Sequence, residues 1–362
     1  MHFRRVCIES FGYTLPDEVV TTAELEMRLS PLYERLRLPE GRLELMTGIR
    51  ERRFFPAGTR PSSVSIISAR KAIEASGIDP RYFGALIHGS VCRDFLEPAT
   101  ACGVHNGLDL PSEAVIYDVS NACLGLLNGV VQLASMIELG QIRAGVVVGT
   151  ECGRELVENT VDLLNSDTSL TRDTVKDYIA SLTIGAASAA IVLCDEELSR
   201  TGNRLTTAVT HCDTSQHNLC QSLGLETIMR TDSEELLRHG IAAGAQAFEK
   251  FLAATGWDPD EINCTFCHQV GVAHRKLMFE SLALNPAIDF ATLETLGNTG
   301  SVALPITMAM GIEQGRVQKD DRVAMLGIGS GINCLMLGVE WQKALIRTGS
   351  EKPAVATAEI GR

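Results

Sequence analysis

DVSNACLGLLNG, residues 118–129, is the stretch on which the interpretation of this chain depends. The apolar run at 115–119 predicts a strand, Ser120 and Asn121 predict a tight turn, and a mostly apolar helix is expected to begin at Cys123. A thiol at that position meets the positive end of the helix dipole and free backbone N–H groups. We therefore expect a lowered pKa for Cys123 and an oxyanion site beside it, whereas the alternative is a buried structural cysteine.

A second copy of this pattern follows later in the chain. IELGQ at 137–141 corresponds to IEQGR at 312–316, and Cys123 and Asn298 each lie 17 residues before the glycine of their own copy. In both copies a polar turn opens an apolar helix, and the glycine just past the helix supplies a left-handed cap. The alternative is a chance recurrence of a helix–strand rhythm that is common in α/β proteins.

Strands flank both copies in the same order. Runs at 144–148 and 322–326 follow the two helices, and earlier runs at 85–88 and 264–268 each end in histidine. Both central helices are apolar nearly all round, which is typical of helices buried between sheets. The pattern predicts an α/β protein of two duplicated halves, with Cys123 and Asn298 facing one cavity.

Polar, turn-rich residues near 195–205 mark the expected boundary between the halves. We assign residues 1–200 to an N-terminal half that carries the cysteine. Residues 201–350 form a C-terminal half that carries histidine and asparagine, and 351–362 form a flexible tail. Three segments outside the repeat are expected insertions that could form substrate-contacting walls: 21–60, 92–112 and 151–182.

Composition excludes several classes of function. The chain has 362 residues, is 45% hydrophobic and carries a formal net charge of −13, which disfavours binding to nucleic acid. Eleven cysteines without framework spacing indicate reduced thiols. No signal peptide or membrane-spanning apolar run is evident, so we expect a cytoplasmic protein without an integral membrane segment.

Two further residues are weak candidates when taken alone. His268 follows a predicted strand, and Asn298 lies in GNTGS at 297–301, so each could be structural. Cys264, Cys267 and His268 match a haem-attachment pattern, but the two cysteines fall within the predicted strand. A second pair of ligands at zinc-site spacing is not evident, and we expect neither a metal nor a separate cofactor.

Taken in order, DVSNACLG, HQV with His268 and GNTGS with Asn298 resemble the Cys-His-Asn site of ketoacyl synthase III-type condensing enzymes. TGIRERRF at 47–54 and GIGSG at 327–331 are also similar to that family, so the resemblance covers nearly the whole chain. It implies a thiolase fold with five layers, α-β-α-β-α, and two duplicated halves.

Within that family the chain looks most like the OleA-type enzymes of olefin biosynthesis. The similar stretches are RLPEGRLELMTGIRERRFF at 37–55, VCRDFLEP at 91–98 and ACLGLLNG at 122–129. The resemblance implies head-to-head, non-decarboxylative Claisen condensation of two long-chain acyl-CoA molecules to a 2-alkyl-3-ketoacyl product. It further implies a homodimer, and downstream biosynthetic enzymes as possible partners.

The family mechanism gives each candidate residue a role. Cys123 would carry the first acyl group, and the backbone N–H groups of Cys123 and Ser330 would hold its oxyanion. His268 and Asn298 would stabilise the enolate of the second acyl-CoA. Glu97 corresponds to a family base that acts in the partner subunit's site, and its structural alternative is a surface ion pair with Arg93.

The same resemblance implies that three arginines bind CoA phosphates: Arg50, Arg52 and Arg53. The alternative is that these arginines are solvated surface charges. Two rival functions stay open. One is a decarboxylating 3-oxoacyl-acyl carrier protein synthase III that uses a malonyl donor. The other is a partner subunit of a heterodimeric condensing enzyme.

Overall fold

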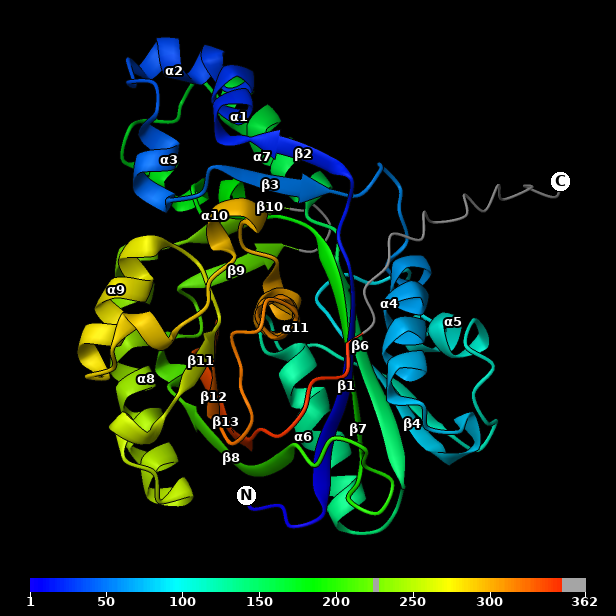
Figure 1. Cartoon of the computed structure of the whole chain (residues 1–362). Coiled ribbons are helices and arrows are strands. Elements are labelled where there is room, and N and C mark those ends of the chain that lie inside the picture. The colour runs from blue at the N-terminus through cyan, green and yellow to red at the C-terminus, as the bar shows by residue number, and fades with distance from the viewer. Residues whose placement is uncertain (224–227, 347–362) are drawn as a thin grey trace, which may run out of the picture.

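A nine-stranded mixed sheet organises the computed structural model, which describes residues 1–223 and 228–346 (Figure 1). The expected tail, 351–362, lies outside the described residues. Along the sheet the strands run in the order β11-β12-β13-β8-β1-β7-β6-β4-β5. Their bounds are β1 (Val6–Thr14), β4 (Phe83–Gly89), β5 (Val115–Val119), β6 (Ala144–Glu151), β7 (Ala187–Asp195), β8 (Arg204–Cys212), β11 (Cys264–Cys267), β12 (Arg322–Gly329) and β13 (Asn333–Glu340).

The arrangement of strands is the same when the sheet is followed outward from its centre in either direction, except that β5 adds a further parallel strand to one half. In one half β4 and β6 are parallel, and β7 and β1 continue antiparallel; in the other, β11 and β12 are parallel, and β13 and β8 continue antiparallel. The halves meet where β1 pairs with β8 at Cys7 and Arg204, and the N-terminal segment adds a bridge between His2 and Thr207. The predicted duplication is therefore visible in the topology, although the half-sheets join into one.

Helices cover both halves and fill the space between them. Their bounds are α1 (Thr22–Arg28), α2 (Ser30–Leu36), α3 (Arg42–Thr47), α4 (Pro61–Ser76), α5 (Thr100–Asn106), α6 (Gly125–Glu138), α7 (Arg154–Ser166), α8 (Ser233–Thr255), α9 (Val272–Ser281), α10 (Leu293–Leu296) and α11 (Ala303–Glu313). Figure 1 shows α6 and α11 in the middle, α4 and α5 outside one half-sheet, and α8 and α9 outside the other. This confirms the five-layer α-β-α-β-α arrangement. None of the described helices is long and apolar enough to cross a bilayer.

The central layer is held by apolar packing from both halves. Leu126 and Val130 of α6, Ile306 and Met308 of α11, and Phe266 of β11 belong to one buried cluster. Helix α11 is apolar all round because strands lie on either side of it, as expected for a helix without a solvent face. Burial of this layer places the start of α6 and the start of α11 inside the molecule.

The expected insertions divide between two places. Segments 21–60 and 151–182 share a buried cluster that includes Leu25, Phe54 and Leu164, so they form one cap over the sheet. The described residues of this region include two two-stranded antiparallel sheets: β2 (Glu18–Thr21) with β3 (Glu51–Phe54), and β9 (Cys220–Leu223) with β10 (Ile228–Thr231). Segment 92–112 instead contributes a loop and α5, which packs against β4 and β5.

The strands predicted at 115–119 and 264–267 match β5 and β11. The two histidines that end the earlier strands, however, are not equivalent. His88 pairs with Val148, whereas the residue that pairs with Leu326, the counterpart of Val148, is Cys267. Since a one-residue offset reverses the face of a strand, His88 lies on the outer face and His268 continues the inner face.

Gly89 permits the close approach of α6 to β4. A Cβ at this position would lie 2.6 Å from Leu126 Cα. We expect Gly89→Ala to lower the free energy of unfolding by about 1–3 kcal/mol, because backbone must move to admit the methyl group. Urea unfolding at fixed protein concentration measures the effect. Gly103→Ala is the control, since its Cβ would meet Ser62 at an ordinary 3.4 Å; equal stability of both variants would contradict the role of Gly89.

Candidate active site

Cys123 lies in the turn between β5 and α6. The turn is made by Ala122, whose φ is 45°, and α6 begins at Gly125, two residues later than expected. A Cβ added to Gly329, the last residue of β12, would lie 3.6 Å from both the Cβ and the backbone nitrogen of Cys123. The nucleophile candidate of one half therefore touches the end of a strand from the other half.

Burial raises the pKa of the Cys123 thiol to about 12, so the expected lowering is wrong. Cys220 and Glu151 act in the same direction, because negative charge nearby disfavours a thiolate. The helix begins beyond Cys123, and a backbone N–H that favours the thiolate does not offset the loss of solvation. The resting thiol is therefore protonated, and its proton needs an acceptor when it attacks.

His268 provides a neutral imidazole. Its backbone N–H donates to Leu326 O at 3.1 Å, which extends the β11–β12 pairing by one residue. The side chain is buried, and neither ring nitrogen has a hydrogen-bond partner within the described residues. Burial lowers the pKa of His268 to about 3, with a smaller contribution from His274. A buried, unpaired imidazole is costly unless a ligand uses it.

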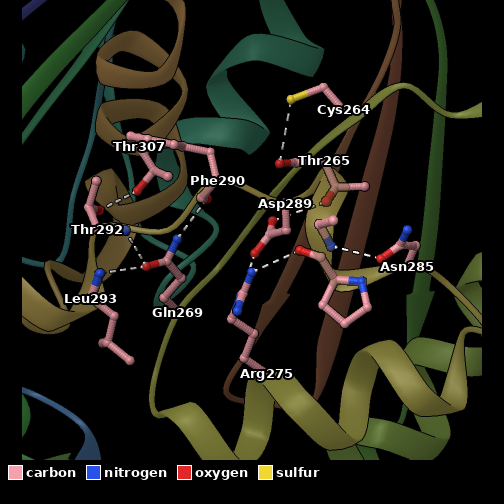
Figure 2. A network of polar contacts seen from close by, with 12 residues as sticks. Cys264, Thr265, Gln269, Arg275, Asn285, Asp289, Phe290, Thr292, Leu293 and Thr307 are labelled. Carbon is pink, nitrogen blue, oxygen red and sulfur yellow. Dashed lines mark hydrogen bonds and ion pairs between the residues drawn. The ribbon is translucent and has the colours of Figure 1, made fainter. Parts of the chain in front are cut away.

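Gln269 fixes the chain just after His268 (Figure 2). Its Oε1 accepts hydrogen bonds from the N–H groups of Thr292 at 3.0 Å and Leu293 at 2.7 Å. Its amide nitrogen donates to Phe290 O at 3.4 Å. These contacts join the end of β11 to the segment that leads toward Asn298.

Asn298 is buried and held on three sides. Its N–H donates to Thr183 O at 2.9 Å, and its carbonyl oxygen accepts from Gly185 N–H at 2.9 Å. The side-chain Oδ1 accepts from Gly300 N–H at 3.0 Å. Because the amide oxygen is used within its own turn, the NH₂ group points the other way as a hydrogen-bond donor.

Ser330 follows Gly329 in the turn between β12 and β13. Asn333 donates through Nδ2 to Ser330 O at 3.2 Å and to Asn121 Oδ1 at 3.3 Å. It thereby ties the turn of Ser330 to the turn of Cys123. Sequence analysis did not single out Asn333, since an asparagine at a strand start carries no catalytic pattern.

Glu97 lies on an exposed loop after β4, away from these buried side chains. The described residues show no ion pair between Glu97 and Arg93, so that structural alternative is absent from this part of the chain. Neighbouring apolar side chains are also exposed: Phe95 by 49% and Leu96 by 92%. Within one chain, Glu97 is not joined to the buried cluster.

The three arginines proposed for CoA lie in different environments. Arg50 is exposed, pairs with Glu294 at 2.7 Å, and borders a surface cleft of about 700 Å³. Arg52 is fully buried and donates to Thr22 Oγ1 and Leu182 O, so we correct its expected role to a structural one. Arg53 donates to Pro16 O at 3.0 Å. Because successive side chains of β3 point to opposite faces, Arg52 is buried whereas Arg53 is partly exposed.

A second residue that the sequence analysis missed is Glu151, at the end of β6. Its side chain is 5% exposed and accepts hydrogen bonds from the Glu97 loop and from the segment after Asn298. The sequence feature that could have identified Glu151 is a carboxylate at the end of an otherwise uncharged strand, AGVVVGTE.

Comparisons with known proteins agree with this architecture. Residues 46–191 match the model of the thiolase N-terminal domain, and residues 252–341 match that of the 3-oxoacyl-[acyl-carrier-protein] synthase III C-terminal domain. The chain is 42% identical to an acyl-CoA:acyl-CoA alkyltransferase from Shewanella oneidensis, with 94% of this chain and 100% of the relative covered. A protein of the same name from Xanthomonas campestris is 33% identical, with the same coverage.

Solved structures show the same fold. A cysteine-to-alanine variant of Xanthomonas campestris OleA superimposes with a TM-score of 0.90 at 33% identity, covering 94% of this chain and 98% of that one. A Xanthomonas oryzae protein described as 3-oxoacyl-(acyl carrier protein) synthase III, FabH, also has a TM-score of 0.90, at 34% identity, covering 94% and 100%. The chain therefore belongs to the acyl-CoA:acyl-CoA alkyltransferase (OleA) family of thiolase-fold, ketoacyl synthase III-like acyltransferases.

Proposed function

We propose that this enzyme joins two long-chain acyl-CoA molecules head to head by a non-decarboxylative Claisen condensation, with Cys123 as the acyl carrier. The observation that carries the proposal is His268, a buried neutral imidazole whose two ring nitrogens have no partner within the described residues. Because both ring nitrogens are unpaired, one can accept the thiol proton as the sulfur attacks, and the N–H of the neutral ring can donate to a substrate oxygen.

Relatives support the substrate class. Two proteins that match nearly this whole chain are named acyl-CoA:acyl-CoA alkyltransferase, and Xanthomonas campestris OleA has been solved with lauric acid and lauroyl-CoA. In that OleA, variants were made at a cysteine and at a glutamate 26 positions before it. Cys123 and Glu97 are separated by the same 26 positions.

In the first half-reaction, His268 accepts the thiol proton while the sulfur of Cys123 attacks the thioester carbon. The N–H groups of Cys123 and Ser330 stabilise the oxyanion of the tetrahedral intermediate. The intermediate collapses to the acyl-enzyme, and the CoA thiolate leaves with the proton from His268. The carboxyl carbon of the first chain is then bound to Cys123.

In the second half-reaction, Glu97 removes an α-proton from the second acyl-CoA. His268 and Asn298 donate hydrogen bonds to the enolate oxygen. The hydrogen bond from Gly300 N–H to Asn298 Oδ1 supports this role, because it leaves the Asn298 NH₂ group available as a donor. The α-carbon attacks the Cys123 thioester, and the released thiolate recovers a proton. The product is a 2-alkyl-3-ketoacyl-CoA, and no carbon dioxide forms.

Glu97 acts, in this proposal, in the active site of a second copy within a homodimer. The carboxylate is exposed on a loop whose apolar side chains Phe95 and Leu96 are also exposed, which suits an interface better than a free surface. Arg50, beside its cleft, and partly exposed Arg53 are the arginines that we retain as contacts for CoA phosphate.

The expectations for cofactors, for the two halves and for localisation belong to the same proposal. The reaction needs only CoA thioesters, so neither a metal nor a separate cofactor takes part. The halves are 1–200 and 201–350, in keeping with strands β1 to β7 before the boundary and β8 to β13 after it. We place the enzyme in the cytoplasm, where its product would pass to further biosynthetic enzymes.

A decarboxylating synthase is the second candidate, because a chain described as FabH has the same fold at similar identity. That reaction obtains its carbanion from a malonyl carboxylate and gives Glu97 no task. A partner-subunit role would not require Cys123, His268 and Asn298 to be kept together.

We expect pure enzyme given myristoyl-CoA alone to form a coupled product from two myristoyl chains, releasing one CoA for each coupling. Mass spectrometry of the extracted lipids and a thiol assay measure the two quantities. Coupling that appears only after malonyl-CoA or malonyl-acyl carrier protein is added, together with carbon dioxide, would instead establish the decarboxylating synthase.

Glu97→Gln is expected to lower the coupling rate by about 100-fold or more, because the amide cannot accept the α-proton. Mixed dimers test whether the base acts in trans. Co-purified Glu97→Gln and Cys123→Ala subunits should regain coupling, since the intact Glu97 of one serves the intact Cys123 of the other. Failure of the mixed dimer to regain activity, with both homodimers folded, would contradict the trans assignment.

A further inference from the structure

Glu151 is a buried carboxylate that the mechanism above does not use. It ends β6, is 5% exposed, and forms no ion pair within the described residues. A carboxylate removed from water in this way is stable only if donors satisfy its oxygens. Its donors come from two segments that are far apart in sequence.

The first segment leads to Glu97. Val91 N–H donates to Glu151 Oε1 at 3.0 Å, and Cys92 N–H donates to Oε2 at 3.3 Å. These are the first two residues after β4 and Ser90, and the chain then runs outward to the exposed Glu97. Glu151 therefore fixes the inner end of the loop that carries the proposed base.

The second segment leads from Asn298. Ser301 approaches Oε1 with its N–H at 3.3 Å and its hydroxyl at 2.5 Å. Gly300 packs directly on the side chain, since a Cβ there would lie 3.1 Å from Glu151 Cγ. Gly300 also donates the hydrogen bond that orients the Asn298 amide. Glu151 thus supports the turn that sets the direction of that amide.

We infer that Glu151 is a positioning residue that couples the Glu97 loop to the Asn298 turn and thereby serves condensation but not acylation. This inference rests on the proposed function. Three of the four donors to Glu151 converge on Oε1 and one reaches Oε2, so both segments hold the carboxylate in place. With Glu97 acting in trans, the same side chain would link the oxyanion donor of its own site to the base of the neighbouring site.

Acylation and condensation depend on different parts of the structure. Acylation uses Cys123 and His268, together with the N–H groups of Cys123 in the turn before α6 and of Ser330 after β12. Condensation additionally needs Glu97 and the Asn298 amide, which are the two groups that Glu151 supports. Loss of Glu151 should therefore separate the two half-reactions, whereas general loosening of the fold would impair both.

Glu151→Gln tests this separation. The new side-chain NH₂ group would face backbone N–H groups, and two donors cannot form a hydrogen bond with each other. We follow acyl-enzyme formation from myristoyl-CoA by rapid-quench intact mass. Its rate should not fall below about half of the wild-type rate, because removal of a negative charge near Cys123 does not disfavour the thiolate. The rate of coupled product should fall by at least about tenfold, while free myristic acid from hydrolysis of the acyl-enzyme increases. Ser301→Ala, which removes a single donor, should shift the same ratio less. Glu158→Gln is the matched control, because Glu158 pairs with Arg154 on the surface of α7.

Equal losses of acylation and coupling in both Glu151→Gln and Ser301→Ala would overturn the inference, as would unchanged coupling in both. Backbone amide exchange provides a measurement that does not depend on activity. Exchange in 91–99 and 298–302 should rise together in Glu151→Gln and not in Glu158→Gln. If exchange in these segments rises in Glu151→Gln but the wild-type enzyme forms no coupled product, only the proposed function is contradicted. If exchange in these segments is unchanged in Glu151→Gln, the role of Glu151 is contradicted.

Discussion

Packing of two apolar helices, α6 and α11, between the half-sheets is the constraint on which the rest of this structure depends. Their side chains share one buried cluster with strands from both halves. The helices therefore bring their first turns, and the turns that precede them, into the interior. Cys123 arrives in this way from one half and Asn298 from the other, and His268 follows on the inner face of β11.

Interior placement determines the chemistry of these groups. Burial holds Cys123 as a thiol and His268 as a neutral imidazole, because both charged forms lose solvation. In the proposed function the reaction cycle begins without a preformed thiolate, and the thiol proton passes to the imidazole during attack. Exposed Glu97 lies outside this interior. In the proposed function a second copy of the chain brings its own Glu97 to the reacting carbon.

Much of the fold was predictable because the repeat leaves a strong pattern. The equal separations of Cys123 and Asn298 from their cap glycines indicated two matching halves, and the topology shows them. Three features escaped the sequence analysis for physical reasons. The one-residue offset between His88 and His268 depends on strand register, the burial of Arg52 on alternation along β3, and the role of Glu151 on contacts between distant segments.

The central claim is that Cys123 carries the acyl group in a site assembled from both halves. Intact mass of the enzyme after brief incubation with myristoyl-CoA, followed by peptide mapping, tests it most directly. The account predicts one myristoyl group for each chain, attached to the peptide that contains Cys123, and no adduct on a folded Cys123→Ala variant. A myristoyl adduct that persists on that variant, or that maps to another cysteine, would contradict the account.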